Sequence, residues 1–149
     1  MTEPIKFYST NGPYGPFSNF ARYPIKYNGD TWPTSEHAFQ AQKFPKDSHH
    51  YSDVRKAKGP KEAAQIGRDR KRPLRKDWDG VKDGVMLEVL RAKFTQHESL
   101  KKLLVESHPA ELIEHTENDN YWADGGNGKG KNVLGKLLMR LRDEIRKQK

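Results

Sequence analysis

Three polar side chains share one face of a predicted helix near the start of the chain. Glu36, Gln40 and Lys43 have i, i+4 and i+7 spacing, which aligns side chains along a helix. Such a stripe is often only a solvent-exposed polar face. Here the helix is entered through the bulky, rigid pair Trp32-Pro33, and a helix N-terminus stabilises a carboxylate in its first turn. We therefore predict that Glu36 is a positioned carboxylate.

A glycine-rich loop over residues 121–132 forms a second group. It combines Tyr121, Trp122 and the carboxylate of Asp124 with four glycines, directly before a predicted helix. Glycine permits positive φ and a close approach of a ligand to the backbone. The first amides of the helix can hold a phosphate, with Asn132 as the N-cap. The two aromatic rings are candidates for stacking on a base or clamping a sugar, although a surface loop without a ligand has a similar composition.

Several other kinds of site are excluded by residue types. The chain has no cysteine, so it has no thiolate nucleophile and no Cys-based zinc site. Its six histidines form no H-x-x-x-H pair, and no G-x-S-x-G motif is present. The glycine-rich loop does not continue into the Ser or Thr of a Walker A motif. We expect no metal site and no cofactor.

Two kinds of chemistry fit the remaining residues. Two carboxylates such as Glu36 and Asp124 suit cleavage of a glycosidic bond, in which one protonates the leaving group and the other activates water or stabilises an oxocarbenium-like transition state. Alternatively, Lys43 beside a base can form a Schiff base with a ring-opened ribose. The residues alone leave both routes open.

The positive charge of the chain is concentrated in one segment. The formal net charge is +8, and residues 54–76 hold ten basic residues against two acids, which accounts for the whole excess. A concentrated basic surface attracts phosphate, on nucleic acid or on a small ligand. A solvated helix face is the alternative interpretation. Trp78, which follows this segment between two aspartates, is either a core anchor or a stacking residue.

The remaining pattern predicts the elements that position these residues. Residues 5–8 predict a strand, and Asn28-Gly29 between β-forming residues predicts a hairpin over 25–32. Pro33-Thr34-Ser35 offers an N-cap for a helix from Glu36 to about Phe44. Further elements are expected in this order: helices over 47–57, 60–70 and 81–95, a helix around Leu100–Leu104 ended by His108-Pro109, a short strand over 111–115, a polar loop over 117–131, and a last helix.

Helices outnumber strands in this order and do not alternate with them regularly. This favours an α+β fold, mainly helical with a small antiparallel sheet, in a single compact domain over residues 1–149. No apolar run approaches the ~18 residues needed to span a bilayer. The N-terminus lacks the basic and apolar regions of a signal peptide. We expect a soluble, cytoplasmic protein with no membrane partner.

Four blocks of the sequence together resemble the NADAR family, whose name stands for NAD- and ADP-ribose-associated. They occur in the expected order over about residues 5–146, and the second block is highly specific. The sequence departs from the family at Ala123, where the family pattern has Gly. The blocks are Phe17-Ser18-Asn19-Phe20; Trp32-x-Thr34-x-Glu36-His37-x-x-Gln40-Ala41-x-Lys43-Phe44; Arg68 with Leu74-Arg75 and Asp77-Trp78-Asp79; and Tyr121-Trp122-x-Asp124-Gly125 with Gly128 and Asn132-x-Leu134-Gly135.

The resemblance implies a hydrolase of N-glycosidic bonds. Carried over residue by residue, it makes Glu36 the best catalytic candidate, with Lys43 and Asp124 beside it. Arg72 is added from the charge of the basic segment. The residues expected to line the substrate site are Asn19, Phe20, Trp32, Gln40, Arg68, Arg72, Trp78, Tyr121, Trp122, Gly125, Gly126, Gly128 and Asn132.

The resemblance also implies two substrate classes. Family members remove ADP-ribose from the guanine amino group in nucleic acid, some as antitoxins to a DNA ADP-ribosyltransferase, or hydrolyse phosphorylated ribosylamino-pyrimidine intermediates of riboflavin synthesis. The size of the basic surplus favours the first class, because one small ligand uses few cations. A modified guanine amine is hard to reach in a duplex, so single-stranded DNA is the preferred partner. A non-catalytic binding module for ADP-ribose or nucleic acid is the third hypothesis.

Overall fold

The chain folds into two compact units. The computed structural model describes residues 2–148. One unit, the central unit, is the continuous stretch Asn19–Lys93. The other, the terminal unit, combines Met1–Ser18 with Phe94–Lys149 and so brings together the two ends of the sequence.

The central unit begins with a β-hairpin. β2 (Ile25–Tyr27) pairs antiparallel with β3 (Asp30–Trp32). The turn between them has positive φ at both central residues, 54° at Asn28 and 81° at Gly29. Asn and Gly tolerate this left-handed conformation, which matches the twist of the two strands. The hairpin predicted from Asn28-Gly29 is therefore confirmed.

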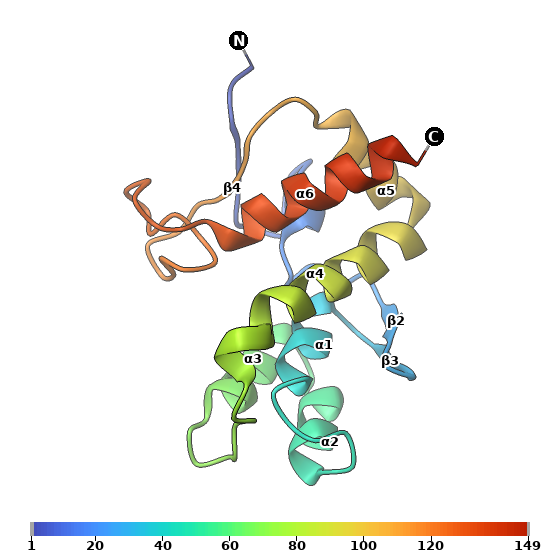
Figure 1. Ribbon diagram of the computed structural model, residues 1–149, viewed down its shortest axis with the longest axis vertical. Helices are drawn as coiled ribbons and strands as arrows, with labels where there is room; N and C mark the ends of the chain where they lie inside the picture. Colours follow the sequence, from blue (N-terminus) through green and yellow to red (C-terminus); the bar gives the residue numbers. More distant parts are fainter. Residues whose placement is uncertain (1, 149) are drawn as a thin grey trace. The chain divides into compact units, whose positions relative to one another are not determined.

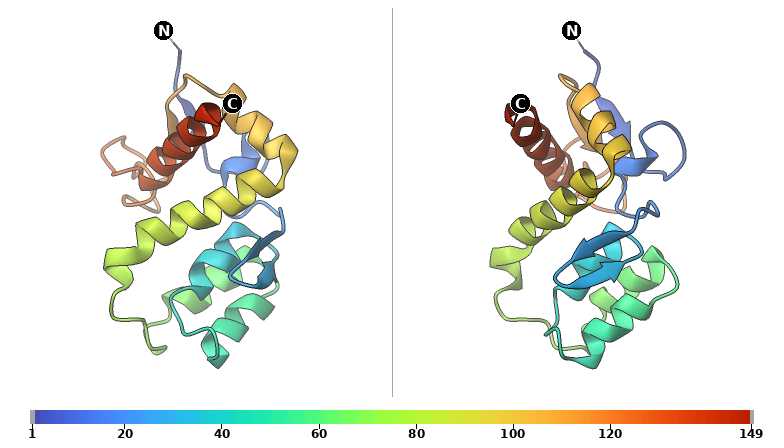
Figure 2. Two further views of the ribbon diagram at one scale, coloured as in Figure 1. Left: turned by 45° about the vertical axis from the view of Figure 1, so that its right-hand side comes forward. Right: turned by 90° about the vertical axis from the view of Figure 1, so that its right-hand side faces the viewer.

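Three short helices follow the hairpin and pack together. α1 (Ser35–Ala41) contacts both α2 (His49–Lys56) and α3 (Pro60–Arg68), and α2 contacts α3. Both views of Figure 2 place these helices side by side. α4 (Trp78–Gln96) belongs to the central unit as far as Lys93. The shared core is apolar and contains Ile25, Trp32, Ala38, Ala41, Phe44, Tyr51, Val54, Ala57, Ala63 and Val89.

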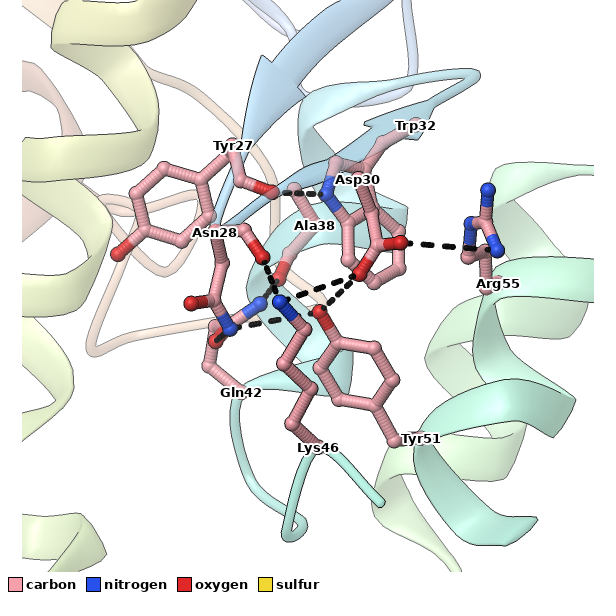
Figure 3. A network of polar contacts seen from close by, with 9 residues as sticks. All are labelled: Tyr27, Asn28, Asp30, Trp32, Ala38, Gln42, Lys46, Tyr51 and Arg55. Carbon is pink, nitrogen blue, oxygen red and sulfur yellow. Dashed lines mark hydrogen bonds and ion pairs between the residues drawn. The ribbon is translucent and has the colours of Figure 1, made fainter. Parts of the chain in front are cut away.

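A polar network ties the hairpin to the helices (Figure 3). The Tyr51 hydroxyl donates to Asp30 Oδ2 at 2.9 Å, and Arg55 forms an ion pair with the same carboxylate at 3.7 Å. Asn28 Nδ2 donates to Gln42 Oε1 at 3.2 Å, just after the end of α1. The hairpin is thus bonded to α2 and to the end of α1, which fixes the position of α1 within the unit.

The terminal unit pairs two strands that lie more than a hundred residues apart in sequence. β1 (Ile5–Phe7) pairs parallel with β4 (Leu112–Glu114), and η1 (Gly15–Phe17) is a short 3-10 helix. α6 (Val133–Lys147) packs against β4 and against α5 (Glu98–Glu106), as Figure 1 also shows. The buried apolar residues of this unit include Phe7, Phe17, Phe94, Leu100, Leu104, Leu112, Leu134, Leu138 and Leu141.

The α+β, mainly helical class predicted from the sequence is confirmed. The sheet prediction needs one correction, because only the β2–β3 pair is antiparallel and the β1–β4 pair is parallel. No tight turn joins β1 to β4, so nothing local imposes the antiparallel direction on that pair. Within residues 2–148, no helix is long and apolar enough to cross a membrane.

Candidate active site

A buried carboxylate at the start of α1 is the centre of the candidate site. Glu36 is 6% exposed and accepts a hydrogen bond from Gln40 Nε2 at 2.8 Å. Thr34 caps the helix, since its side chain accepts from the His37 amide at 3.2 Å. Gln40 itself is 3% exposed. The predicted polar stripe is therefore buried, which excludes the interpretation as an ordinary solvent-exposed face.

Lys43 lies in the turn that follows α1 and is also buried. It is 8% exposed, and its Nζ donates to the carbonyl oxygen of Gly67 at 3.2 Å. The same Nζ lies 5.8 Å from the centre of the Trp78 ring. Gly67 stands in the last turn of α3, where carbonyl groups have no partner within the helix. The end of α3 thus positions the amine of Lys43.

The surroundings of Lys43 lower the pKa of its amine. The pKa of Lys43 is lowered to about 8, from the ordinary lysine value of 10.5, and burial is the largest cause. The positive charge of Arg70 is the second cause of this lowering, and Arg68 and Lys82 contribute less. The Glu36 carboxylate acts in the opposite direction and raises the pKa. A lysine with this pKa holds a reactive fraction of free amine near neutral pH.

Asn19 anchors the first turn of α1. Its carbonyl oxygen accepts from the Glu36 amide at 3.1 Å, and its Oδ1 accepts from the Ser35 hydroxyl at 2.8 Å. Its Nδ2 lies 3.5 Å from the sulfur of Met86. The neighbouring Phe20 is 38% exposed. These contacts give Asn19 a positioning role, while substrate contact by either residue stays a prediction.

Trp32 requires a correction. It is 0% exposed, and its indole N–H donates to the Tyr27 carbonyl at 2.9 Å. Its ring meets Tyr51 edge-on, with centroids 5.2 Å apart. Because a fully buried ring with a satisfied N–H offers nothing to a ligand, Trp32 packs the core instead of lining the substrate site.

Trp78 is a buried side chain next to Lys43. It is 6% exposed and packs on Phe39, with ring centroids 5.2 Å apart. Of the two roles considered for it, the structure therefore favours the core anchor. Its ring nevertheless faces the Lys43 amine, so it also limits the access of water to that amine.

Arg72 requires a second correction, because its guanidinium is committed to neighbouring acids. Its Nη1 lies 2.8 Å from Asp53 Oδ2, and its Nε lies 3.6 Å from Asp69 Oδ2. The pairing also holds the pKa of the Asp53 carboxyl below its usual range, through a hydrogen bond in the first place. Arg72 ties the segment after α3 to α2 and is not a free anion-binding group.

The glycine-rich loop belongs to the terminal unit, and Asp124 is its internal anchor. Asp124 is 4% exposed; its Oδ2 lies 2.6 Å from His115 Nδ1, and its Oδ1 accepts from the amides of Gly126 and Thr116 at 2.8 and 3.2 Å. Burial alone would raise the pKa of Asp124, but these hydrogen bonds together hold it below its ordinary value. Both carboxylate oxygens therefore have partners, in the loop and in the residues that follow β4.

The two aromatic rings of the loop are half-buried and packed edge-on, with centroids 5.0 Å apart. The amides of Tyr121 and Trp122 both donate to Asp119 Oδ1 at 2.8 Å. Lys131 Nζ lies 5.5 Å from the centre of the Tyr121 ring. A polar depression of about 590 Å³ is lined by Asp119, Gly125 and Lys131 among others, and neither aromatic ring belongs to its lining.

Glycine conformations in the loop agree with the sequence, but the role of Asn132 does not. Gly125, Gly126 and Gly128 have φ of 74°, 81° and 79°, as glycine permits. Asn132 precedes α6 with φ of 51° and makes no side-chain cap. Its side-chain amide instead bonds to both ends of β4. Nδ2 donates to the Leu112 carbonyl at 2.9 Å, and Oδ1 accepts from the Glu114 amide at 3.0 Å. Its polar atoms are thus committed to β4.

Ala123 departs from the family pattern without disturbing the loop. It is 0% exposed and is not among the residues with positive φ. An alanine at this position therefore meets no backbone strain. The amide of Asn132 donates to its carbonyl at 3.0 Å, so the loop closes normally at this point.

The structure gathers the predicted residues into two groups. Glu36, Gln40, Lys43 and Trp78 lie together in the central unit, with Arg68 at the end of α3. Asp124, Tyr121 and Trp122 lie together in the terminal unit. Sequence reasoning missed Gly67 and Arg70, whose importance comes from contacts between α1 and the end of α3 that no spacing reveals.

The chain matches a family model, known relatives and a solved structure over nearly its whole length. A family model described as the NADAR domain matches residues 6–146 of the chain. The chain is 59% identical over 141 residues to N-glycosidase YbiA of Escherichia coli (strain K12), covering 95% of this chain and 88% of that protein. It is 39% identical over 158 residues to the riboflavin biosynthesis protein PYRR, chloroplastic, of Zea mays, covering 97% of this chain and 25% of that protein. The NMR structure of E. coli YbiA matches with a TM-score of 0.90 and 57% identity, over 98% of this chain and 86% of that chain.

Proposed function

Because the chain belongs to the NADAR domain family, we propose that it is an N-glycosidase acting on the bond between C1 of a phosphorylated ribose and an amino group of a heterocycle. One observation carries the proposal. A buried carboxylate, Glu36, is held by Gln40 at 2.8 Å and acts electrostatically on a buried lysine whose pKa is about 8. A binding module has no need of such a pair, whereas hydrolysis of a glycosidic bond needs both a base and an acid.

In the direct route, Glu36 accepts a proton from the attacking water while the hydroxide adds to C1. The C1–N bond breaks, its electron pair goes to the amine, and the Lys43 ammonium supplies the proton that the amine takes up. Exchange with solvent then restores Glu36 and Lys43. In the second route, the ribose ring opens and the free amine of Lys43 adds to C1. The C1–N bond to the heterocycle breaks, and the leaving amine keeps its electron pair and takes up the proton that Lys43 gives up, which leaves a Schiff base between Lys43 and C1. Water then hydrolyses this Schiff base, which releases the sugar aldehyde and restores the Lys43 amine.

Borohydride separates the two routes. A Schiff base on Lys43 is reduced to a stable secondary amine, so trapping with substrate present leaves the protein heavier by the reduced sugar phosphate. Peptide mass spectrometry then locates the adduct on Lys43. Turnover without any trapped adduct favours the direct route.

Two substrates carry the required bond, and each is favoured by a different observation. ADP-ribosylated guanine in single-stranded DNA is favoured by charge, since seven of the ten basic residues in 54–76 have no carboxylate partner among the described residues. An enzyme of this kind reverses the action of a DNA ADP-ribosyltransferase. Phosphorylated ribosylamino-pyrimidines are favoured by the names of relatives, which include riboflavin biosynthesis proteins of Zea mays and Vibrio vulnificus.

The decisive experiment offers both substrates to the protein and to Glu36→Gln. One substrate is a single-stranded oligonucleotide with one ADP-ribosylated guanine, and the other is a ribosylaminopyrimidine 5′-phosphate. We expect release by the wild type and at least a hundredfold loss in Glu36→Gln, because a glutamine keeps the contact with Gln40 but cannot take up the proton. Unchanged turnover in that variant would remove Glu36 from catalysis.

Salt and surface charge distinguish the two substrates. Release from the oligonucleotide is expected to fall steeply between 50 and 200 mM salt. It is also expected to fall in Lys56→Glu/Lys58→Glu, which reverses two exposed cations without a carboxylate partner in the described chain. Release from the small phosphate should respond to neither change. Equal responses for both substrates would contradict a role of the basic segment in holding nucleic acid.

A further inference from the structure

Two cations converge on a single carbonyl oxygen beside the candidate site. Lys43 Nζ donates to Gly67 O at 3.2 Å, and Arg70 Nη2 donates to the same oxygen. Arg70 Nε also donates to the Arg68 carbonyl at 3.1 Å, so the guanidinium is wrapped around the end of α3 and has a fixed orientation. Lys43 is buried, whereas Arg70 is exposed, and the pair therefore extends from the interior to the surface.

Capping of a helix explains only part of this arrangement. The C-terminus of a helix carries about half a negative charge and attracts a cation. Here Lys43, Arg70 and Arg68 all lie at the end of α3, and Arg68 makes no hydrogen bond or ion pair through its side chain within residues 2–148. The cations thus exceed what the helix end can balance, and like charges this close repel one another.

The nearby acids do not supply the missing negative charge. Asp69, between the two arginines, is turned away, with one oxygen accepting from the Lys71 amide at 3.0 Å and the other 3.6 Å from Arg72 Nε. No carboxylate lies within ion-pairing distance of Arg70 in the described chain. Glu36 is the acid that acts on Lys43, against Arg70, Arg68 and Lys82. The cluster therefore has a net positive charge and free donors.

We propose that Arg70, with Arg68 at the rim and the positive charge of Lys43 behind it, forms a subsite for a phosphate group of the substrate. A guanidinium presents paired N–H donors that match two phosphate oxygens, and the Lys43 ammonium adds a charge from the buried side. The Gly67 carbonyl is the acceptor that keeps both cations in place. The proposal deepens the proposed function, on which it rests for its choice of a sugar phosphate as ligand.

The subsite also links binding to the charge of Lys43. The groups that face this amine are Glu36 from α1, Arg68 from α3, Arg70 from the following turn and Lys82 from α4. An added phosphate opposes the repulsion from the three cations and raises the pKa of Lys43. Substrate binding would thereby favour the ammonium form, which in the direct route donates a proton to the leaving amine.

The test measures binding without turnover, using ribose 5-phosphate as the probe and NMR titration of the full chain. Arg70→Gln is compared with Lys71→Gln, which removes the same charge from the adjacent exposed residue and touches neither Gly67 nor Lys43. We expect affinity for ribose 5-phosphate to fall at least tenfold in Arg70→Gln and less than twofold in Lys71→Gln. Free ribose, offered as a control ligand, should not distinguish the variants.

A second readout follows the pKa of Lys43 by NMR of its labelled side chain. Arg70→Gln should raise this pKa, because a repelling cation is removed, and ribose 5-phosphate should raise it in the wild type. Equal weakening by both substitutions, or a loss of thermal stability in Arg70→Gln with unchanged phosphate affinity, would overturn the subsite and leave Arg70 as a helix cap. Intact phosphate binding without turnover of either substrate would contradict the proposed function but not the subsite.

Discussion

Gly67 contacts three residues at the candidate site, which are Lys43, Arg70 and Gln40. Its carbonyl accepts from Lys43 and Arg70, and a Cβ at this position would overlap the Oε1 of Gln40. That Oε1 is buried and has no hydrogen-bond partner in the described structure. It can lie this close to Gly67 only because glycine has no side chain. The position of Gln40, and with it the hydrogen bond to Glu36, depends on a residue in another helix.

Gly67→Ala is therefore expected to lower both stability and activity. The added methyl group forces Gln40 away from Glu36, and overpacking of this kind costs about 1–3 kcal/mol. The matched control is Gly84→Ala in α4, where an added Cβ meets nothing within 4 Å. The control should gain up to about 1 kcal/mol, because alanine is the better helix former. Urea unfolding and the release assay measure both effects, and equal stability of the two variants would contradict the packing argument.

At the residue level, the sequence predicted the polar stripe but not its surroundings. Spacing alone aligned Glu36, Gln40 and Lys43, and all three are buried. Spacing could not reveal that Trp32 has no exposed surface or that Arg72 is paired with Asp53 and Asp69, since both facts arise from contacts across the fold. Residue types indicate which chemistry is available, and packing decides which residues can perform it.

At the scale of elements, most boundaries were predicted closely because they depend on local signals. Asn28-Gly29 fixed the hairpin, and Pro60 fixed the start of α3. The helix expected to reach Phe44 ends at Ala41 instead. Its continuation forms tight turns, in which the amides of Lys43 and Phe44 donate to the carbonyls of Gln40 and Ala41 at 3.2 and 3.1 Å. Such an early end comes from tertiary contacts of Lys43 and is invisible to local patterns.

The glycine-rich loop is an element organised by one carboxylate, and this yields a test of its role. Asp124→Asn should speed hydrogen exchange at the amides of Gly126 and Thr116, because a neutral side chain accepts their hydrogen bonds less strongly. Glu117→Gln, which removes an exposed charge from the chain shortly before the loop, should leave exchange unchanged. Unchanged exchange with lost activity in Asp124→Asn would instead indicate a catalytic Asp124.

The charge of Asp124 also makes the loop sensitive to acid. Because its folded pKa lies below its unfolded value, its contribution to stability is fully present above the unfolded pKa of about 3.8. That contribution is lost as the pH falls through the folded pKa. The rate of hydrogen exchange in the loop, taken relative to the intrinsic rate at each pH, should accordingly rise at acid pH in the wild type. The rise should be smaller in Asp124→Asn.

Two buried lysines affect the molecule as a whole. Burial lowers the pKa of Lys93 to about 7 and is the largest cause that lowers the pKa of Lys43 to about 8, from 10.5. Between these folded values and 10.5 the unfolded chain binds more protons, so the free energy of unfolding should rise with pH. From pH 7 to pH 9 we expect a rise on the order of 3–4 kcal/mol, measured by urea unfolding.

Lys93→Met tests the assignment of this pH dependence. Methionine keeps an unbranched side chain but cannot titrate, so roughly two thirds of the rise should disappear. Lys102→Met, at an exposed position of α5, is the matched control and should retain the full rise. A rise that persists unchanged in Lys93→Met would place its origin elsewhere.

The division of the chain into its two units has a consequence for the order of synthesis. The central unit, Asn19–Lys93, is continuous, whereas the terminal unit needs residues before 19 and after 93. β1 must wait for β4, which is made about a hundred residues later, before it has a strand to pair with. On the ribosome the central unit can therefore close first, while the N-terminal strand stays unpaired until translation is nearly complete.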